Sequence, residues 1–250
     1  MEQSSDLDWE LHIREIAGSW LFSDLPTKQL PPVVLLPFEN PDLHDRSLFS
    51  SLLSEIREFR SVWLARYRGC QLAILNSRFG SPAVAMTVDL LSDLGVRALL
   101  GIGFCGAINQ KINCGDLVLP LACVRDEGTC THYVPLSYPA VVSPECFFSL
   151  REKVASCGHP WHSGLVWSTD AVLLETSDKV EVQNKRHVLA VDMECSTLFT
   201  ISRLKGIAAA AILVASDHPG RRQLADPNLV AKGLGHAARV LLDTAVHLSC

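Results

Sequence analysis

The sequence predicts an α/β fold of three layers, in which helices flank a mixed, mostly parallel central sheet that is partly barrel-like. Segments with strand character alternate with segments of helical periodicity along most of the chain, the order expected of parallel strands joined by helices. The predicted strands are short, continuous apolar runs, typical of strands that are buried on both faces. With 250 residues, 48% of them hydrophobic, the chain is long enough to bury one large core.

The chain divides near residue 32 into an N-terminal arm and one domain. Residues 1–32 are expected to form a polar arm with a single amphipathic piece, Trp9–Leu21, which ends before Pro31 and Pro32. Residues 33–250 contain no repeat, linker or low-complexity segment, so we expect them to fold as a single domain.

The elements of this domain follow from apolar runs, helical periodicity and their terminators. The expected strands are 33–36, 61–67, 70–76, 96–102, 116–125, 163–168, 188–192 and 207–215. The expected helices are 48–59, 82–94, 144–157, 194–204 and 229–248. Ser81 and Pro82 predict the start of the second helix, as N-cap and first helical residue, and Gly95 ends it.

Composition excludes several classes of function. A net charge of −5 and no basic stripe argue against nucleic-acid binding. The nine cysteines are scattered without a C-x-x-C pair or Cys/His spacing, so no metal site is expected. Their odd number and the polar first residues favour a reducing, cytoplasmic setting. The longest apolar run, Gly206–Ala215, is too short to span a membrane.

The segment Gly101–Gly106 fits G-x-G-x-x-G, a pattern of dinucleotide-binding proteins. That pattern requires a strand before the glycines and a helix after them, with the pyrophosphate at the helix N-terminus. Only nine residues, 107–115, precede the next expected strand, which is too few for a helical crossover. We therefore expect no nicotinamide or flavin, and interpret the glycines as a sharp turn that approaches a ligand closely.

Acidic residues follow two other expected strands. Asp192, Met193 and Glu194 come after one, and Ser216 and Asp217 after the other. Ligands of open α/β sheets bind at the carboxyl ends of strands. A carboxylate at a helix N-terminus, such as Glu194, could accept hydrogen bonds from paired sugar hydroxyls. Asp217 follows a very apolar strand, where desolvation would raise its pKa and let it donate a proton.

Each of these residues also has a structural interpretation. Either acid could serve only as a helix N-cap, and Met193 could be ordinary core. Cys105 lies on the glycine segment, but the sequence places no His or Asp to activate it, so we interpret it as a buried thiol. Three polar strand ends in one chain favour a common site.

With these segments assembled, the chain resembles the nucleoside phosphorylase family, which includes uridine phosphorylase and the bacterial hexameric purine nucleoside phosphorylases. The likeness runs from about residue 33 to the end of the chain. The segments that carry it most specifically are 56–59, 103–108, 115–118, 124–129 with 132–133, 167–171, 191–194 and 216–217.

The resemblance implies cleavage of a nucleoside by phosphate, with no cofactor, in a homo-oligomer (dimer or hexamer) whose subunits share sites. Glu194 would hold the ribose hydroxyls, Met193 would lie against the sugar, and Asp217 would protonate the leaving purine, assisted by Arg221 or Arg222. Other substrate contacts would come from the same segments, at Asp192, Phe104, Cys105, Gly106, Thr169 and Val172. Arg57 would reach a neighbouring subunit's phosphate, with Gly103, Arg46 and Arg78 as further phosphate candidates.

The sequence departs from the family pattern where phosphate and base are bound. Gly101 stands in place of an arginine, and Phe104 in place of a Thr or Ser. The first loop reads Phe38-Glu39-Asn40-Pro41 where the family has G-D-P. Arginines bind phosphate strongly because they form two directional hydrogen bonds. Arg78 stands where the family has glycine, and is either a replacement cation or a solvated loop residue.

The base contacts leave the reaction open among three hypotheses. Thr176 and Asp178 stand near the positions of the uracil-binding Gln and Arg, and Val172 replaces a stacking aromatic, so we expect a purine rather than uridine. The first hypothesis is a phosphorylase with an altered phosphate site. The second is a nucleosidase that uses water, and the third is an inactive member that binds a nucleoside or a partner subunit.

Overall fold

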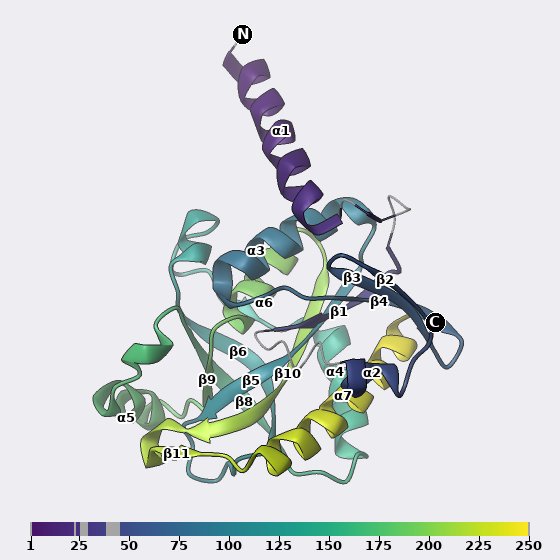
Figure 1. Ribbon diagram of the computed structural model, residues 1–250. Coiled ribbons are helices and arrows are strands. Elements are labelled where there is room, and N and C mark those ends of the chain that lie inside the picture. The colour runs from purple at the N-terminus through teal and green to yellow at the C-terminus, as the bar shows by residue number, and fades with distance from the viewer. Residues whose placement is uncertain (1, 23, 26–29, 39–45, 250) are drawn as a thin grey trace.

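The computed structural model describes residues 2–22, 24–25, 30–38 and 46–249 (Figure 1). One mixed sheet holds β1 (Val33–Pro37), β2 (Ser54–Phe59), β3 (Val62–Tyr67), β4 (Cys70–Leu75), β5 (Ala98–Ala107), β6 (Leu117–Asp126), β7 (Ala140–Val141), β8 (Trp161–Thr169), β9 (Ala190–Asp192), β10 (Ala208–His218) and β11 (Gln223–Leu224). The helices are α1 (Glu2–Phe22), α2 (Arg46–Ser50), α3 (Gly80–Leu91), α4 (Pro144–Ala155), α5 (Ser177–Lys185), α6 (Cys195–Leu204) and α7 (Pro227–Ser249).

The strand order confirms the predicted architecture. The sheet runs β11-β10-β6-β8-β9-β5-β1-β4-β3-β2, and β5 also pairs with β10. This extra pairing closes β10, β6, β8, β9 and β5 into a ring, so part of the sheet is a barrel. Strands β1, β4, β5 and β10 pair in parallel, as do β6, β8 and β9, whereas the pairs of β2 and β3 with their neighbours are antiparallel.

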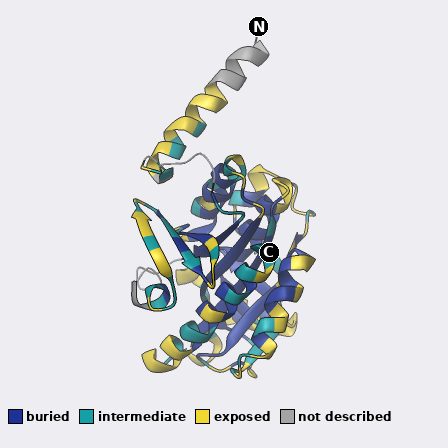
Figure 2. Cartoon of the chain, turned by 90° about the vertical axis from the view of Figure 1, so that its right-hand side faces the viewer, coloured by how far each residue is buried: buried dark blue, intermediate teal, exposed yellow. Residues whose placement is uncertain are grey.

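Helices cover the sheet on both sides, which completes the three layers. Helices α3 and α6 pack together on one side, and α4 and α7 pack together on the other (Figure 1). Strands β1, β5, β9 and β10 are almost entirely buried and form the centre of the core, whereas β2 is largely exposed (Figure 2). A second, smaller cluster around Trp167 and Val180 joins β8 and β9 to α5. In the described part of the chain, no helix combines the length and apolarity needed to cross a bilayer.

The glycine segment is not a turn, which corrects the sequence interpretation. Strand β5 runs through it to Ala107, and none of its glycines has a positive φ. A Cβ on Gly101 would lie 2.4 Å from the ring of Phe38, and a Cβ on Gly103 would lie 2.9 Å from it. At Gly106 a Cβ would lie 2.8 Å from Pro219. These glycines therefore exist because neighbouring side chains approach the strand closely. As expected, no helix follows them before β6.

Two predicted elements differ from the structure. The helix expected over 48–59 is wrong, because only Arg46–Ser50 is helical and Ser54–Phe59 forms β2. Pairing with β3 in a hairpin overrides the local periodicity there, since Phe59 pairs with Val62 next to the turn. Helix α3 begins at Gly80, with φ +78°, and Ser81 does not cap it. The Ser81 hydroxyl donates instead to the carbonyl of Met193, at 3.0 Å.

The contact between Phe38 and Gly101 predicts a measurable coupling in stability. Gly101→Ala should cost about 1–3 kcal/mol in the free energy of unfolding, because the added methyl group overpacks against the Phe38 ring. In a Phe38→Ala background the same change should cost much less, which a double-mutant cycle from urea denaturation measures.

A glycine without close neighbours serves as the control. Gly235→Ala lies in α7, where a Cβ meets nothing within 4 Å, and should be neutral or stabilising. Equal destabilisation by Gly101→Ala with and without Phe38 would contradict the proposed close packing.

Candidate active site

A cavity of about 120 Å³ lies where β5, β9 and β10 end, and it gathers most of the predicted substrate residues. Its lining consists of Phe104, Cys105, Gly106, Val172, Glu175, Val191, Asp192, Met193, Ser216 and Asp217. Seven of these were predicted as site residues from the sequence. Glu175, Val191 and Ser216 were not, although Val191 and Ser216 lie in segments of the family resemblance.

The segment Asp192–Glu194 is fixed by the N-termini of two helices. The N–H groups of Glu194 and Cys195 donate to Asp192 Oδ2, at 3.3 and 2.8 Å, so Asp192 satisfies the first turn of α6. The Ser168 hydroxyl donates to Asp192 Oδ1, at 2.6 Å. Burial raises the pKa of Asp192, and these hydrogen bonds oppose the shift. The Asp192 carboxylate therefore lines the cavity but serves chiefly to hold α6.

Glu194 connects the same segment to α3. Its Oε1 accepts a hydrogen bond from the N–H of Gly80, the first residue of α3, at 2.7 Å. Its Oε2 accepts from the N–H of Met193, at 3.2 Å. A carboxylate at a helix N-terminus is stabilised by about 0.3–1 kcal/mol, and by up to about 2 kcal/mol when partly buried. Glu194 is fully buried and is not part of the cavity lining, whereas its neighbour Met193 is.

Asp217 projects from an irregularity in β10. The register of β10 against β5 shifts between Ala215 and Asp217, which leaves Ser216 as an extra residue. Such bulges turn a side chain away from the regular alternation of a strand. Burial raises the pKa of Asp217, and the hydrogen bond from the Ser216 hydroxyl, at 2.9 Å, opposes the shift. Asp217 can thus hold a proton at a pH where an exposed aspartate has lost it.

Arg221 and Arg222, the two arginines that were predicted to assist Asp217, do not pair with it. The Arg221 guanidinium donates instead to the side chain and carbonyl oxygens of Gln110, at 2.8 and 2.6 Å. Arg222 is exposed, with φ +52°. His218, the next residue after Asp217, is buried, and burial lowers its pKa, which favours the neutral imidazole. A role for Arg221 or Arg222 beside Asp217 stays a prediction.

The mouth of the cavity has an apolar rim. Val172, Leu173 and Leu174 form a short 3-10 helix and are all exposed, Leu173 to 95%. Thr169 does not line the cavity. It is buried at the end of β8, where its hydroxyl accepts from the Ala171 N–H at 3.3 Å and shapes the turn into this rim. Of these three residues Val172 is the one that lines the cavity, so its apolar side chain is the one that can contact a ligand there.

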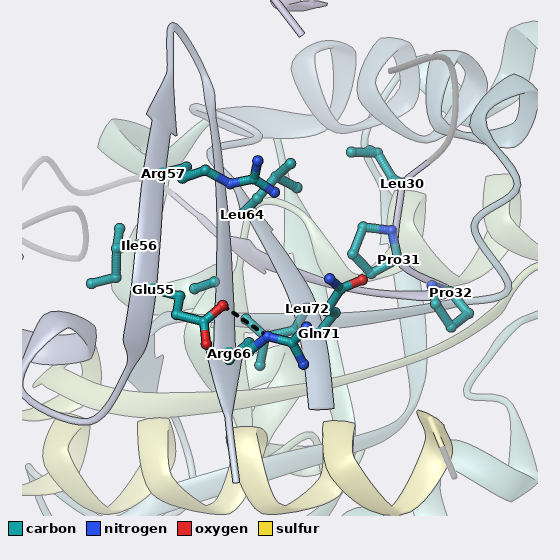
Figure 3. Close-up of a pocket in the computed structure, with 11 residues that line it drawn as sticks. Leu30, Pro31, Pro32, Glu55, Ile56, Arg57, Leu64, Arg66, Gln71 and Leu72 are labelled. Atoms are coloured by element: carbon teal, nitrogen blue, oxygen red, sulfur yellow. Dashed lines mark hydrogen bonds and ion pairs between the residues drawn. The ribbon is translucent and has the colours of Figure 1, made fainter. Parts of the chain in front are cut away.

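The predicted phosphate residues are dispersed. Gly103 is covered by Phe38, and the side chain of Arg46, at the start of α2, lies outside the described residues. Arg57 lies in a different cavity, of about 860 Å³, on the β2–β3–β4 sheet region, where Arg66 pairs with Glu55 (Figure 3). Its contact with a neighbouring subunit stays a prediction.

Arg78 is the phosphate candidate that lies next to the start of α3, where Glu194 is bound. It pairs through its backbone with Phe38, and it precedes Gly80, the partner of Glu194, by two residues. Its φ of +63° is a left-handed conformation that costs a residue other than glycine about 1–2 kcal/mol. Its side chain is exposed at this turn. Strain of this kind is concentrated at functional sites.

The electrostatic character of the cavity is acidic. Glu175, Asp192 and Asp217 contribute carboxylates, and within the described residues no lysine or arginine is part of the lining. The described residues also contain no group of three His, Cys, Asp or Glu side chains arranged to hold a metal ion. Positive charge for an anionic ligand would therefore have to come from residues outside this lining.

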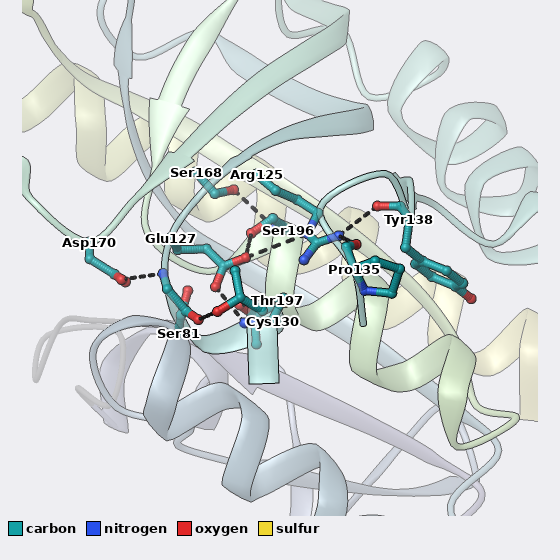
Figure 4. A network of polar contacts seen from close by, with 12 residues as sticks. Ser81, Arg125, Glu127, Cys130, Pro135, Tyr138, Ser168, Asp170, Ser196 and Thr197 are labelled. Carbon is teal, nitrogen blue, oxygen red and sulfur yellow. Dashed lines mark hydrogen bonds and ion pairs between the residues drawn. The ribbon is translucent and has the colours of Figure 1, made fainter. Parts of the chain in front are cut away.

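A buried polar network joins the loop after β6 to α6 (Figure 4). Glu127 accepts hydrogen bonds from the Cys130 N–H, at 2.8 Å, and from the Ser196 hydroxyl on α6, at 3.3 Å. Arg125 donates to the carbonyl oxygens of Pro135 and Tyr138, at 2.9 and 2.7 Å. These hydrogen bonds attach the loop after β6 to α6. They therefore help to position the start of α6, which binds Asp192.

Fold and cavity together define a class of protein, and comparison with known proteins identifies the family. The phosphorylase superfamily matches residues 34–246, and the chain belongs to this superfamily. It is 34% identical to a guanosine phosphorylase of Halorubrum lacusprofundi, over 65% of this chain and 67% of that protein. It is 33% identical to a uridine phosphorylase of Haemophilus influenzae, over 70% of this chain and 74% of that protein.

A solved structure supports the same family. A uridine phosphorylase from Vibrio fischeri superposes with a TM-score of 0.81 and 27% identity, covering 88% of this chain and 93% of that chain. By their names, some of these relatives act on purine nucleosides, as the guanosine phosphorylase and a purine nucleoside phosphorylase of Colwellia psychrerythraea do, and others act on uridine.

The raised pKa of Asp217 predicts a gain of stability when its charge is removed. Because folding disfavours the ionised form, Asp217→Asn should stabilise the protein at pH 7. The sign follows from the direction of the shift. The stability that protonated Asp217 gives the wild-type protein is fully present below the pKa of the unfolded state, about 3.8. This stability is lost as the pH rises through the higher pKa of the folded state. Urea denaturation from pH 3 to pH 8 should therefore show that the gain vanishes below the pKa of the unfolded state.

An exposed aspartate provides the control. Asp226→Asn, near the start of α7, changes the same group but should show no such pH-dependent gain. Destabilisation by Asp217→Asn at pH 7 would contradict the assignment of a desolvated acid.

Proposed function

We propose that this protein cleaves the N-glycosidic bond of a purine nucleoside by phosphorolysis, giving the free base and ribose 1-phosphate. The observation that supports it most is Asp217, a carboxyl group of raised pKa that opens into the cavity. A leaving purine needs a proton or a hydrogen bond at its imidazole nitrogen, and an acid of raised pKa is better suited to supply it than an exposed aspartate. The reaction needs inorganic phosphate as co-substrate and no other cofactor.

The cavity suggests how the nucleoside is held. The ribose lies against Met193, which forms the wall in front of Glu194. A carboxylate oxygen accepts more than one hydrogen bond, so Glu194 can receive the ribose hydroxyls while it keeps its backbone donors. Because Glu194 is fully buried, this binding requires a small displacement of the turn at Gly80. The base extends past Asp217 toward the apolar rim at Val172.

In this proposal, positively charged residues outside the acidic cavity lining bind the phosphate. Arg78 is the best placed cation of this chain, because its turn leads directly to Gly80 and Glu194. Its strained backbone is consistent with a residue kept for its side chain. Arg57 of a neighbouring subunit is the second cation of the proposal.

Hydrolysis is the alternative reaction, and one observation favours it. The Phe38 ring fills the space that a side chain at position 101 would occupy, so this strand cannot present a cation there. Together with the acidic cavity wall, this apolar filling disfavours a bound phosphate and leaves water as the nucleophile.

An assay with and without phosphate separates these reactions. Purified protein is incubated with inosine, guanosine, adenosine and uridine, and the base and sugar products are separated. The proposal predicts base and ribose 1-phosphate from a purine nucleoside only when phosphate is present, and loss of activity by at least a hundredfold in Asp217→Asn. Equal base release without phosphate would show hydrolysis. No release from any nucleoside, with binding still measurable, would favour an inactive member.

The role of Arg78 has its own test in the phosphate dependence. Arg78→Gly removes the cation and also relieves the left-handed strain, so it should raise the KM for phosphate at least tenfold without loss of stability. Arg68→Gly is a matched control, because Arg68 also has a positive φ, of +47°, but lies in the β3–β4 turn. An unchanged KM for phosphate in Arg78→Gly would exclude Arg78 from the phosphate site.

A further inference from the structure

Helix α1 extends from the body of the protein as a separate rod (Figures 1 and 2). It carries large apolar side chains that the rest of the chain leaves uncovered. Trp9 is 64% exposed and Trp20 is 58% exposed, and Ile13 and Ile16 are exposed as well. The helix lies outside residues 34–246, the part of the chain that matches the phosphorylase superfamily, so the family does not account for it.

These four residues form one stripe, defined here as the α1 stripe: Trp9, Ile13, Ile16 and Trp20. Their spacings of four, three and four residues are those of alternate core positions in a coiled coil. Because successive residues of a helix are about 100° apart, all four lie on the same face.

The opposite face of α1 is the one that contacts the body. The half-buried residues Arg14, Gly18 and Phe22 lie there, four residues apart. Arg14 donates to the Asp89 carboxylate of α3, at 2.9 Å, and also pairs with Asp93. These contacts are on the opposite face of α1 from the stripe, whose four residues stay exposed. Most of the stability of a helix in a protein comes from packing of its apolar face, so α1 would gain stability if the stripe were covered.

We propose that the α1 stripe is a self-association surface, on which α1 from a second copy of this chain packs in the antiparallel direction. The stripe reads Trp-Ile-Ile-Trp from either end, with symmetric spacings, so it is complementary to a reversed copy of itself. In that register Trp9 faces Trp20 of the other copy and Ile13 faces its Ile16. A two-fold interface requires this kind of self-complementarity.

The charges of the helix favour the antiparallel direction. Four acidic residues, Glu2, Asp6, Asp8 and Glu10, lie in its first half, and none follows Glu15 within the helix. A parallel pair would place the acidic halves side by side, and an antiparallel pair places each beside the second half, in which Arg14 and Glu15 balance each other. The opposed helix dipoles add to this preference.

A membrane surface fits the stripe less well. Helices that lie on membranes carry lysine or arginine on the polar face to meet anionic lipids. Arg14 is the single Lys or Arg in the α1 sequence, and it is engaged by Asp89 and Asp93. The acidic composition of α1 would repel such a surface.

Sedimentation equilibrium of the full chain tests the proposal. The double variant Ile13→Glu/Ile16→Glu should weaken association at least tenfold, or reduce the assembly by a factor of two if other interfaces persist. Leu11→Glu is the matched control, because Leu11 is 54% exposed on the same helix but off the stripe, and it should associate as the wild type does. Unchanged thermal unfolding of the body shows that each variant is folded. Unchanged association of the double variant would overturn the proposal.

A disulfide experiment tests the direction of packing. A mixture of Trp9→Cys and Trp20→Cys proteins should form a disulfide between positions 9 and 20, identified by mass spectrometry of the digest. Disulfides between two copies of position 9 instead would overturn the antiparallel register. Stripe-dependent flotation with vesicles of phosphatidylcholine and phosphatidylserine, without self-association, would overturn the proposal in favour of a membrane surface.

Discussion

The Glu194 carboxylate, held between the N–H groups of Gly80 and Met193, is the interaction on which the site depends. It joins the start of α3 to the start of α6, two helices that pack together on one side of the sheet. Asp192 completes the anchor by satisfying the first turn of α6. Two buried carboxylates within three residues are costly unless backbone donors meet them, and the two helix N-termini provide these donors. The backbone of Met193 is thereby fixed as a wall of the cavity.

The same cavity separates the base side of the reaction from the phosphate side. On the base side the β10 bulge presents Asp217 in a desolvated position, with Ser216 as its hydrogen-bond donor. On the other side the Phe38 ring takes the place of a side chain at Gly101, and positive charge has to come from Arg78 or from a second subunit. In the proposed mechanism, Asp217 keeps the role of proton donor, whereas the anion-binding residues differ from the family pattern.

Much of this was predictable from the sequence, because it depends on local pattern. Apolar runs located the buried strands, and the short segment after Gly106 excluded a dinucleotide fold. What could not be predicted depends on contacts between distant segments. Gly101 is needed because the ring of Phe38, 63 positions away in the sequence, packs against it. The Ser81 hydroxyl binds the carbonyl of Met193 instead of capping α3. Glu175 enters the cavity from a loop without any periodic pattern, and β2 was mistaken for a helix because its partner strand decides its conformation.

The account is tested most directly by a crystal structure of the protein with a bound purine nucleoside and phosphate. The ribose should lie against Met193 within hydrogen-bond distance of Glu194, with the imidazole nitrogen of the base beside Asp217 and the phosphate in contact with Arg78 or with Arg57 of a neighbouring subunit. A nucleoside bound elsewhere, or one whose base lies away from Asp217, would contradict the central claim that the ends of β5, β9 and β10 form the active site.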